Sequence, residues 1–291
     1  MNFLVTGAAS PLGMAVCRRI RTTEARITGV VKPGGNVPPQ ELVDELIHVD
    51  LAEPADFRRI RDRYDAVIHV AALSEGSPDQ LMSATGLSAF RLLLRARELE
   101  IPTIVHVSSM AVYGNVETPL VSSRTPIRHS SPYGAAKWAA ECYLSSGQPS
   151  TNCVSVRAPA IVGMRSHRHF LARTLSQMAL GVKEVFASNP EFLFNNLIHE
   201  ETLADFLITL AVTPPRKFVA VPVSSSEPMR LREVLDTLAE ATNFKGRITW
   251  SSSGTPPFSI DSEEAVSLGL RQLTTRSTLQ RWLKKIPKNI D

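Results

Sequence analysis

The chain has 291 residues, 43% of them hydrophobic, which is enough for one sizeable α/β domain with an appended lobe. Its formal net charge is +4, with a pI of about 9.1, but lysine and arginine are scattered, which argues against a nucleic acid track and suits a small anionic ligand. No apolar run approaches the roughly 20 residues of a membrane span, and three distant cysteines (Cys17, Cys142 and Cys153) predict a cytoplasmic protein without a disulfide framework or a metal site.

The amino terminus combines an apolar strand, a glycine turn and the start of a helix. Residues 1–6 are typical of a strand rather than a signal peptide, because no charged region precedes the short apolar stretch. Gly7 and Gly13 permit a tight turn, and a helix beginning near Pro11 or Leu12 would direct free N–H groups at a phosphate. The arrangement predicts a pyrophosphate site for a dinucleotide; a strand-to-helix turn that binds nothing is the alternative.

A second strand, residues 26–31, ends at Lys32, where the adenosine ribose of a dinucleotide would lie. A carboxylate at this place favours NAD, whereas a cation accommodates the 2′-phosphate of NADP. Because residues 30–35 contain no Asp or Glu, Lys32 favours NADP over NAD. The alternative is that Lys32 is a solvated loop charge.

The third strand, residues 46–51, ends in Asp50 and Leu51. Asp50 is placed to accept a hydrogen bond from the adenine amino group, with Leu51 against the ring. The alternative is that Asp50 caps a helix that begins at Ala55.

The fourth strand, residues 66–72, is a continuous apolar run of the kind that a parallel sheet buries on both faces. Small Ala71 and Ala72 at its carboxyl end leave room for a cofactor to cross. His69 lies inside the strand, where we expect a packed core histidine rather than a catalyst. A helix over residues 80–99 follows.

The fifth strand, residues 101–109, completes an alternation of strands and helices. This alternation predicts an α/β fold with a doubly wound parallel sheet. Ligands of such sheets lie beyond the carboxyl ends of the strands. Ser108 and Ser109 stand at such an end.

Tyr133 and Lys137 are four positions apart at the start of a predicted helix, so both side chains share one face. A phenol beside an ammonium ion has its anionic form favoured, which would lower its pKa and suit it to exchange a proton near neutral pH. A surface Tyr and Lys on a helix is the alternative. With Ser108 and Ser109 at the neighbouring strand end, the pair completes a Ser, Tyr and Lys constellation.

In their order and spacing these segments resemble the extended short-chain dehydrogenase/reductases of the NAD-dependent epimerase/dehydratase family, over nearly the whole chain. Several ordered motifs are far more specific than any one of them. The similar segments are Thr6-Gly7-x-x-Ser10-x-x-Gly13, Asp50-Leu51, His69-Val70-Ala71-Ala72, residues 108–114, Tyr133-x-x-x-Lys137, residues 157–163 and residues 196–204.

The resemblance implies a Rossmann fold and a role for each candidate residue. Tyr133 would be the acid-base group, Lys137 would lower its pKa and hold the nicotinamide ribose, and Ser109 would hydrogen-bond the reacting oxygen, with Ser108 as the neighbouring candidate. NADP or NAD would be bound by Gly7, Ser10, Pro11, Leu12, Gly13, Lys32, Asp50, Leu51, Ala71, Ala72, Tyr133 and Lys137.

The chain departs from the family pattern at three places. Ser10 replaces the middle glycine of the pyrophosphate turn, although its hydroxyl would add a donor. Ser83 stands three residues before Gly86, where the family has Asn. Residues 110–111 are Met-Ala, whereas the dehydratases of the family have Asp-Glu at the corresponding positions. This difference disfavours sugar dehydration, because that reaction needs a further acid and base.

A second lobe is expected beyond the sixth strand, residues 152–157, where the apolar periodicity becomes irregular. The dinucleotide-binding domain would comprise residues 1–163 with the return of 195–223, and the substrate lobe 164–194 and 224–291. A basic segment begins this lobe, and a solvated loop is favoured over a metal site because no carboxylate or cysteine lies nearby. As part of a substrate lobe it would face a nucleotide diphosphate. Its basic residues are Arg165, His167, Arg168, His169 and Arg173.

From the resemblance we expect hydride transfer at a sugar carbon, C4 in particular, of a nucleotide-linked sugar, by reduction of a keto group or by epimerisation. A reductase of a non-nucleotide carbonyl compound and a non-catalytic sensor that binds NADP are the alternatives. The expected partners are a small-molecule substrate and a second copy of the chain in a homodimer formed by the helices at residues 80–99 and 133–145, with no nucleic acid and no membrane.

Overall fold

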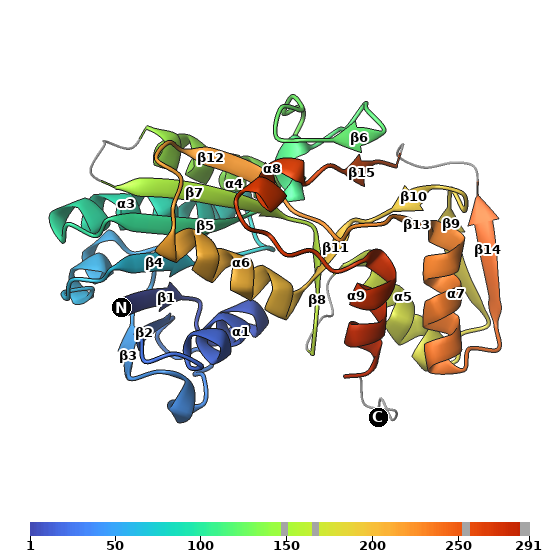
Figure 1. The fold of residues 1–291 in the computed structure, drawn as a ribbon, viewed down its shortest axis with the longest axis horizontal. Coiled ribbons are helices and arrows are strands. Elements are labelled where there is room, and N and C mark those ends of the chain that lie inside the picture. Colours follow the sequence, from blue (N-terminus) through green and yellow to red (C-terminus); the bar gives the residue numbers. More distant parts are fainter. Residues whose placement is uncertain (147–150, 165–168, 252–256, 286–291) are drawn as a thin grey trace.

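The computed structural model describes residues 1–146, 151–164, 169–251 and 257–285. Its centre is a parallel sheet with the strand order β12-β7-β5-β4-β1-β2-β3 (Figure 1). The order reverses between β1 and β4, so this α/β fold is doubly wound, as predicted. The strands are β1 Asn2–Thr6, β2 Arg26–Val31, β3 Glu45–His48, β4 Ala66–His69, β5 Thr103–Ser109, β7 Asn152–Ala158 and β12 Val219–Pro222.

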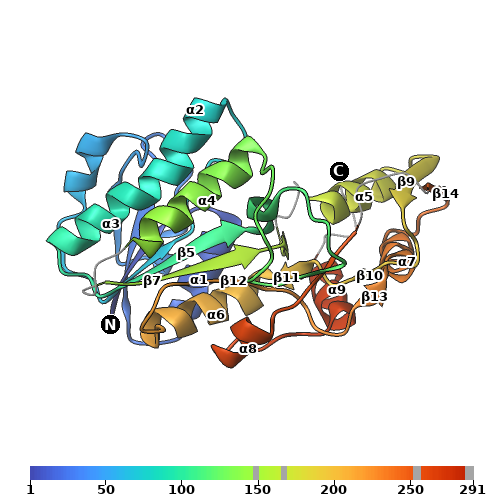
Figure 2. The ribbon, with the colours of Figure 1, turned by 90° about the horizontal axis from the view of Figure 1, so that it is seen from above.

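Helices cover both faces of the sheet (Figure 2). One face carries α1 (Pro11–Ile20) and α6 (Glu200–Val212), and the other carries α3 (Ser88–Glu98) and α4 (Pro132–Ser145). Successive residues of a strand point to opposite faces. Apolar side chains on both faces therefore bury two separate clusters, one against α1 and α6 and one against α3.

The predicted helix over residues 80–99 is wrong as a single element. It consists of α2 (Pro78–Leu81), the π-helix η3 (Met82–Leu87) and α3. A capping box at Ser77 starts it earlier than predicted. In the π-helical turn the Thr85 hydroxyl donates to the Leu73 carbonyl (3.0 Å), and the Ser83 hydroxyl donates to the Ala52 carbonyl (3.4 Å). Periodicity alone does not reveal such a turn, because it inserts only one residue.

Other boundaries shift by a few residues. β3 ends at His48 and β4 at His69, so that Asp50, Leu51, Ala71 and Ala72 lie in the loops that follow these strands. Met229 and Arg230 pair with the short strand Leu193–Phe194, and a helix begins at Leu231.

Beyond the sheet, a small lobe has its own apolar core (Figure 1). Trp282, Leu235, Leu175 and Leu279 are among the residues buried there. We use "small lobe" for its elements α5 Phe170–Ala179, β9 Glu184–Ser188, β10 Leu193–Phe194, β13 Met229–Arg230, α7 Leu231–Thr242, β14 Arg247–Ser251 and α9 Thr275–Leu283.

The remaining elements are short. They are η1 Gln40–Leu42, η2 Pro54–Arg59, η4 Met110–Tyr113, β6 Leu120–Val121, β8 Ala160–Val162, β11 Leu197–His199, β15 Ser259–Ile260 and α8 Glu263–Ser267. None of the helices in the described ranges is long and apolar enough to span a bilayer. Cys17, Cys142 and Cys153 are free thiols, and only Cys142 is exposed.

Candidate active site

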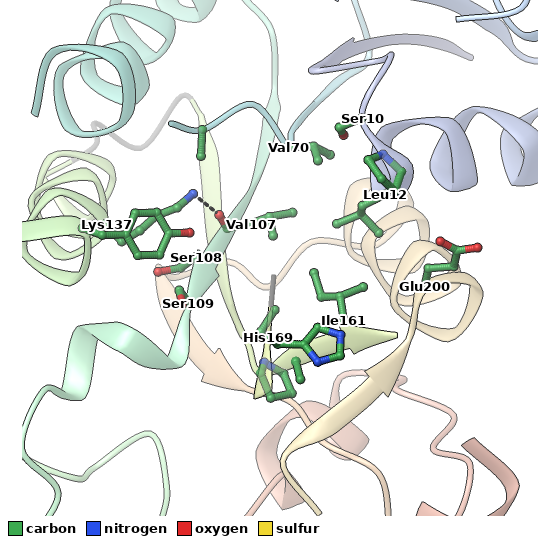
Figure 3. A pocket seen from close by; sticks show the side chains of 16 residues that line it. Ser10, Leu12, Val70, Val107, Ser108, Ser109, Lys137, Ile161, His169 and Glu200 are labelled. Atoms are coloured by element: carbon green, nitrogen blue, oxygen red, sulfur yellow. Dashed lines mark hydrogen bonds between the residues drawn. The ribbon is translucent and has the colours of Figure 1, made fainter. Parts of the chain in front are cut away.

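A cavity of about 570 Å³ opens at the carboxyl ends of β1, β4, β5 and β7 (Figure 3). Lys137 reaches into it from one side, while Ser10 and Leu12 lie on the opposite side. Among the residues predicted to bind cofactor or substrate, the cavity lining contains Ser10, Pro11, Leu12, Ala72, Ser108, Ser109, Tyr133, Lys137 and His169. Lys32, Asp50 and Leu51 are not part of this lining.

The turn after β1 has the shape that a pyrophosphate requires. Gly7 has φ +67°, and a Cβ there would stand 2.9 Å from the Ala71 nitrogen. A Cβ on Gly13 would collide with the Gly7 carbonyl, so only glycine allows α1 to approach the turn this closely. At the helix N-terminus the Leu12 N–H has no acceptor within the helix. These residues fit a dinucleotide.

Ser10 caps α1, because its side chain accepts a hydrogen bond from the Gly13 N–H (3.0 Å). The hydroxyl proton is left for a further acceptor. The substitution of the expected glycine by Ser10 therefore provides a helix cap while keeping a donor on the cavity wall.

Lys32 and Asp50, which the sequence analysis treated as independent groups, form an ion pair with each other (3.2 Å). The Asp50 carboxylate also accepts from the Ala52 N–H (3.0 Å). The suggestion that Asp50 caps a helix is wrong, because Glu53 precedes η2 and makes no side-chain cap. Leu51 is 9% exposed and packs in the core against α3.

The loop after β4 is tied to the turn after β1. The Ala71 N–H donates to Thr6 Oγ1 (3.2 Å), which also bonds His69 Nδ1 (2.7 Å). His69 is buried, as expected for a packed core histidine, and burial lowers its pKa to about 3. Ala72 lines the cavity.

Tyr133 and Lys137 lie in the first turns of α4, which begins after the Ser131 cap with Pro132 as its first residue. The Lys137 amine donates to the Val107 carbonyl (2.5 Å), and burial lowers its pKa to about 7 (Figure 3). Burial raises the pKa of Tyr133, opposed by a hydrogen bond with Ser109. This direction is opposite to the one expected from a neighbouring ammonium.

Ser108 and Ser109 point to different partners. The Ser108 hydroxyl is buried and donates to Glu141 (2.5 Å) on the sheet-facing side of α4. The Ser109 side chain accepts from the Ala111 N–H (3.1 Å) and meets Tyr133. Ser109 is therefore the serine available beside the phenol.

Glu141 and Arg157 form a buried ion pair that the sequence analysis missed. Arg157 contacts the Glu141 carboxylate through Nε (3.0 Å) and Nη2 (2.6 Å), and Arg157 Nη1 donates to the Tyr113 hydroxyl (2.8 Å). The pair joins α4 to β7. The signal was available, since Glu141 follows Tyr133 and Lys137 at another four-residue step along the same helix face.

The side of the cavity that faces the small lobe carries His169, Ile161 and Glu200 (Figure 3). The His169 ring accepts from the Ala172 N–H (3.2 Å) at the start of α5. Glu200 is 2% exposed, and burial raises its pKa. Arg165, His167 and Arg168 of the predicted basic loop lie outside the described residues.

A second cavity of about 640 Å³ lies in the small lobe, next to the first along α5. Its described lining contains five phenylalanines and no charged side chain; the phenylalanines are Phe170, Phe186, Phe192, Phe194 and Phe258. The amides of Asn189 and Asn196 supply polar groups. This wall suits a flat or apolar group.

The model of the NAD dependent epimerase/dehydratase family matches residues 3–206. The chain is similar to the D-erythronate dehydrogenase of Cupriavidus necator (33% identity over 166 residues, 50% of each chain) and to the UDP-glucose 4-epimerase of Streptomyces lividans (23% over 277 residues, 83% of this chain and 81% of the other). Some curated relatives are matched over only 50% to 64% of their length.

Among solved structures, the fold resembles the Bordetella bronchiseptica enzyme WbmG in complex with NAD and UDP. The TM-score is 0.84 at 17% identity, and the match covers 97% of this chain and 94% of the other. At this identity the likeness concerns the fold.

Proposed function

The chain belongs to the NAD-dependent epimerase/dehydratase family, whose enzymes are of the extended short-chain dehydrogenase type, and on this premise we propose that it transfers hydride between a nicotinamide dinucleotide and a carbinol carbon of its substrate. The observation that carries the proposal is the convergence of Tyr133, Ser109 and Lys137 on one wall of the cavity, opposite the pyrophosphate turn. When bound, the dinucleotide accepts or supplies the hydride.

In this proposal Tyr133 exchanges the proton of the substrate oxygen. Its raised pKa keeps the phenol protonated at neutral pH, as a proton donor in ketone reduction requires. Ser109 holds the same oxygen by a hydrogen bond. In the oxidation direction, the Lys137 ammonium would stabilise the phenolate that Tyr133 becomes.

For the substrate we propose a nucleotide-linked sugar, with C4 as the reacting carbon. The similarity to a UDP-glucose 4-epimerase over 83% of the chain supports this class. Reduction of a keto sugar and epimerisation through a transient ketone both use the residues described. We further propose a homodimer and a cytoplasmic location. Trp138 on the outer face of α4 is 45% exposed. A large exposed aromatic side chain of this kind suits a helix face that the second subunit of a dimer covers.

A second candidate is a carbonyl compound without a nucleotide. The observation that favours it is the small-lobe cavity, whose described lining is rich in phenylalanine and has no charged side chain. A diphosphate is usually bound by cationic side chains, which this lining does not supply. The similarity to a D-erythronate dehydrogenase also supports it.

Turnover assays separate these candidates. Purified protein is mixed with NADPH or NADH and panels of nucleotide-linked keto sugars and free carbonyl compounds, and nicotinamide absorbance is followed. Absorbance misses redox-neutral epimerisation, so product sugars are also analysed by chromatography. Turnover confined to one panel identifies the substrate class.

Tyr133→Phe is the matched control for this assay, since it removes only the hydroxyl. We expect at least about a 100-fold loss of kcat, because general acid-base catalysis contributes about that much or more. Full activity of Tyr133→Phe would refute the acid-base role. Tight dinucleotide binding without turnover of either panel would instead indicate a non-catalytic sensor.

A further inference from the structure

A row of polar side chains crosses the sheet on the face that α4 covers. The parallel register sets His69 beside Thr6 on one side and His106 on the other, and His106 beside Ser155, one residue from each of four strands. All four are at most 1% exposed. Buried polar groups without partners cost free energy, so each should have a defined partner.

The hydrogen bonds fix where the proton of His106 resides. His106 Nδ1 is 3.1 Å from Ser155 Oγ, and His106 Nε2 is 3.5 Å from Lys137 Nζ. While Lys137 is protonated it can only donate, so Nε2 then accepts from Lys137 and Nδ1 carries the proton that goes to Ser155. Burial holds the pKa of His106 well below its usual range, which keeps the ring a neutral acceptor.

Two consecutive residues of β5 therefore hold the Lys137 amine. Val107 accepts through its carbonyl (2.5 Å) and His106 through its ring (3.5 Å). An ammonium has three N–H groups in a tetrahedral arrangement. With two directed at β5, the third is left for the cavity that Lys137 lines.

We propose that His106 is a positioning residue of the active site, which accepts from the Lys137 ammonium, fixes its direction and favours its charged form, while Ser155 holds the imidazole in the tautomer that this requires. Any effect of His106 on catalysis rests on the proposed function, in which Lys137 assists Tyr133. The hydrogen bond between His106 and Lys137 does not depend on the proposed function.

The other titratable groups around Lys137 have separate partners. Glu141, on the same helix, raises the Lys137 pKa, but Arg157 from β7 pairs with it. Arg91 and Arg95 of α3 donate to backbone carbonyls, and Arg95 also pairs with Glu98. The remaining titratable groups on α4 and on the elements that pack against it are Tyr133, Cys142, Tyr143, Tyr113, Asp79, Arg97 and Cys153, and His69 lies on the neighbouring strand β4.

The test measures the Lys137 pKa directly in the cofactor-free protein. Lysine is labelled with carbon-13, the side-chain resonance is followed against pH, and Lys137→Met assigns the signal. In His106→Phe, which removes the acceptor, we expect the pKa to fall by about one unit, since a hydrogen bond to a charged group is lost. His106→Gln, whose side-chain oxygen can accept, should restore most of the shift.

His69→Phe is the matched control. His69 lies in the same row, stacks on His106 with 5.5 Å between ring centroids, and is equally buried, but its hydrogen bond goes to Thr6. In His69→Phe we expect the Lys137 pKa to equal that of the unmodified protein. Ser155→Ala, which changes little volume, should lower the pKa by less than His106→Phe and serves if the phenylalanine variant fails to fold. The proposal is overturned if the Lys137 pKa is unchanged both in folded His106→Phe and in Ser155→Ala, or in Ser155→Ala alone where His106→Phe does not fold.

With a substrate in hand, the alkaline limb of the kcat/KM profile should move to lower pH in His106→Phe by the same amount as the measured pKa. If kcat/KM falls equally at every pH and the alkaline limb does not move, His106 contributes only to packing. If no substrate is turned over, the NMR titration still decides whether His106 holds Lys137, so failure of this inference is distinguishable from failure of the proposed function.

Discussion

Lys137 is 2% exposed, and burial lowers its pKa from 10.5 to about 7. Between these two values the unfolded chain binds more protons than the folded one, so stability should rise with pH across this window. Below the folded pKa both states are protonated, and the full cost of the buried ammonium is present. The buried amine of Lys137 thus weakens the fold at neutral pH.

Lys137→Met should therefore stabilise the protein at neutral and lower pH while it reduces turnover. The thermal midpoint should rise by about 2–4 °C for each kcal/mol of relieved burial cost. Thermal unfolding at several pH values measures this, and the variant should lose the rise between neutral and alkaline pH. Lys245→Met, at an exposed position, is the control. A lower midpoint for Lys137→Met at neutral pH would contradict the argument.

The Lys32–Asp50 pair bears on the choice between NADP and NAD. A 2′-phosphate beside Lys32 would also meet the Asp50 carboxylate, whose charge repels it. Asp50→Asn should tighten NADP binding several-fold and leave NAD nearly unchanged, whereas Lys32→Ala should weaken NADP. Calorimetric titration of both dinucleotides gives the dissociation constants. Equal effects on both dinucleotides would exclude this pair from the ribose site.

At the scale of elements, α4 carries two of the residues that we propose for catalysis. Tyr133, Lys137 and Glu141 follow one another at four-residue intervals on its inner face. The first two line the cavity, and the third anchors the helix to β7 through Arg157. The anchor keeps the catalytic face against the strand ends.

Glu141→Gln should be among the most destabilising single changes in this helix. It leaves the buried Arg157 guanidinium without its counter-charge, and breaking such a pair costs about 3–5 kcal/mol. Urea unfolding measures the loss. The control is Glu100→Gln, whose partner Arg63 is exposed, where we expect less than about 1 kcal/mol. Similar losses in both variants would show that the buried pair does not anchor α4.

The elements also mark where sequence reasoning succeeded. The second strand and the α4 helix were predicted within a residue, because apolar runs and a cap define them locally. The π-helical turn η3 was not predicted, since its cause lies in contacts such as the Thr85 bond to Leu73. The same reason hid Glu141 and Arg157, which are 16 residues apart in sequence but bonded in space.

At the scale of the whole molecule, the chain leaves the central sheet and returns to it. After the small-lobe helix α5 it comes back as α6, which packs against α1, and as β12, which pairs with β7. A fragment that ends at residue 163 would lack both elements. The apolar face that includes Ile68, Val105 and Val107 would then keep only α1 as its cover.

Fragment 1–163 is therefore expected to expose apolar surface and to unfold without a cooperative transition, whereas the full chain unfolds cooperatively. Dye binding and urea unfolding followed by circular dichroism test this. A sharp transition of the fragment would mean that α6 and β12 are dispensable for the core.

The fold class followed from the alternation of strands and helices, which is a local pattern. The side of the site that faces the small lobe followed only in part: His169 belongs to the basic segment expected there, whereas Ile161 and Glu200 were not predicted, because the pairing of β8 with β11 brings them together. Likewise, no local pattern showed that Lys32 and Asp50 neutralise each other.

The central position of β1 has a consequence for synthesis of the protein on the ribosome. β1 emerges first, but the cavity beside it also takes Glu200 as a wall, far along the chain. A nascent chain cannot complete the site until that residue has left the exit tunnel. A dinucleotide therefore cannot assist the early steps of folding through the finished cavity, and until α6 is made the growing sheet has one apolar face that only α1 covers, so part of it is open to chaperones.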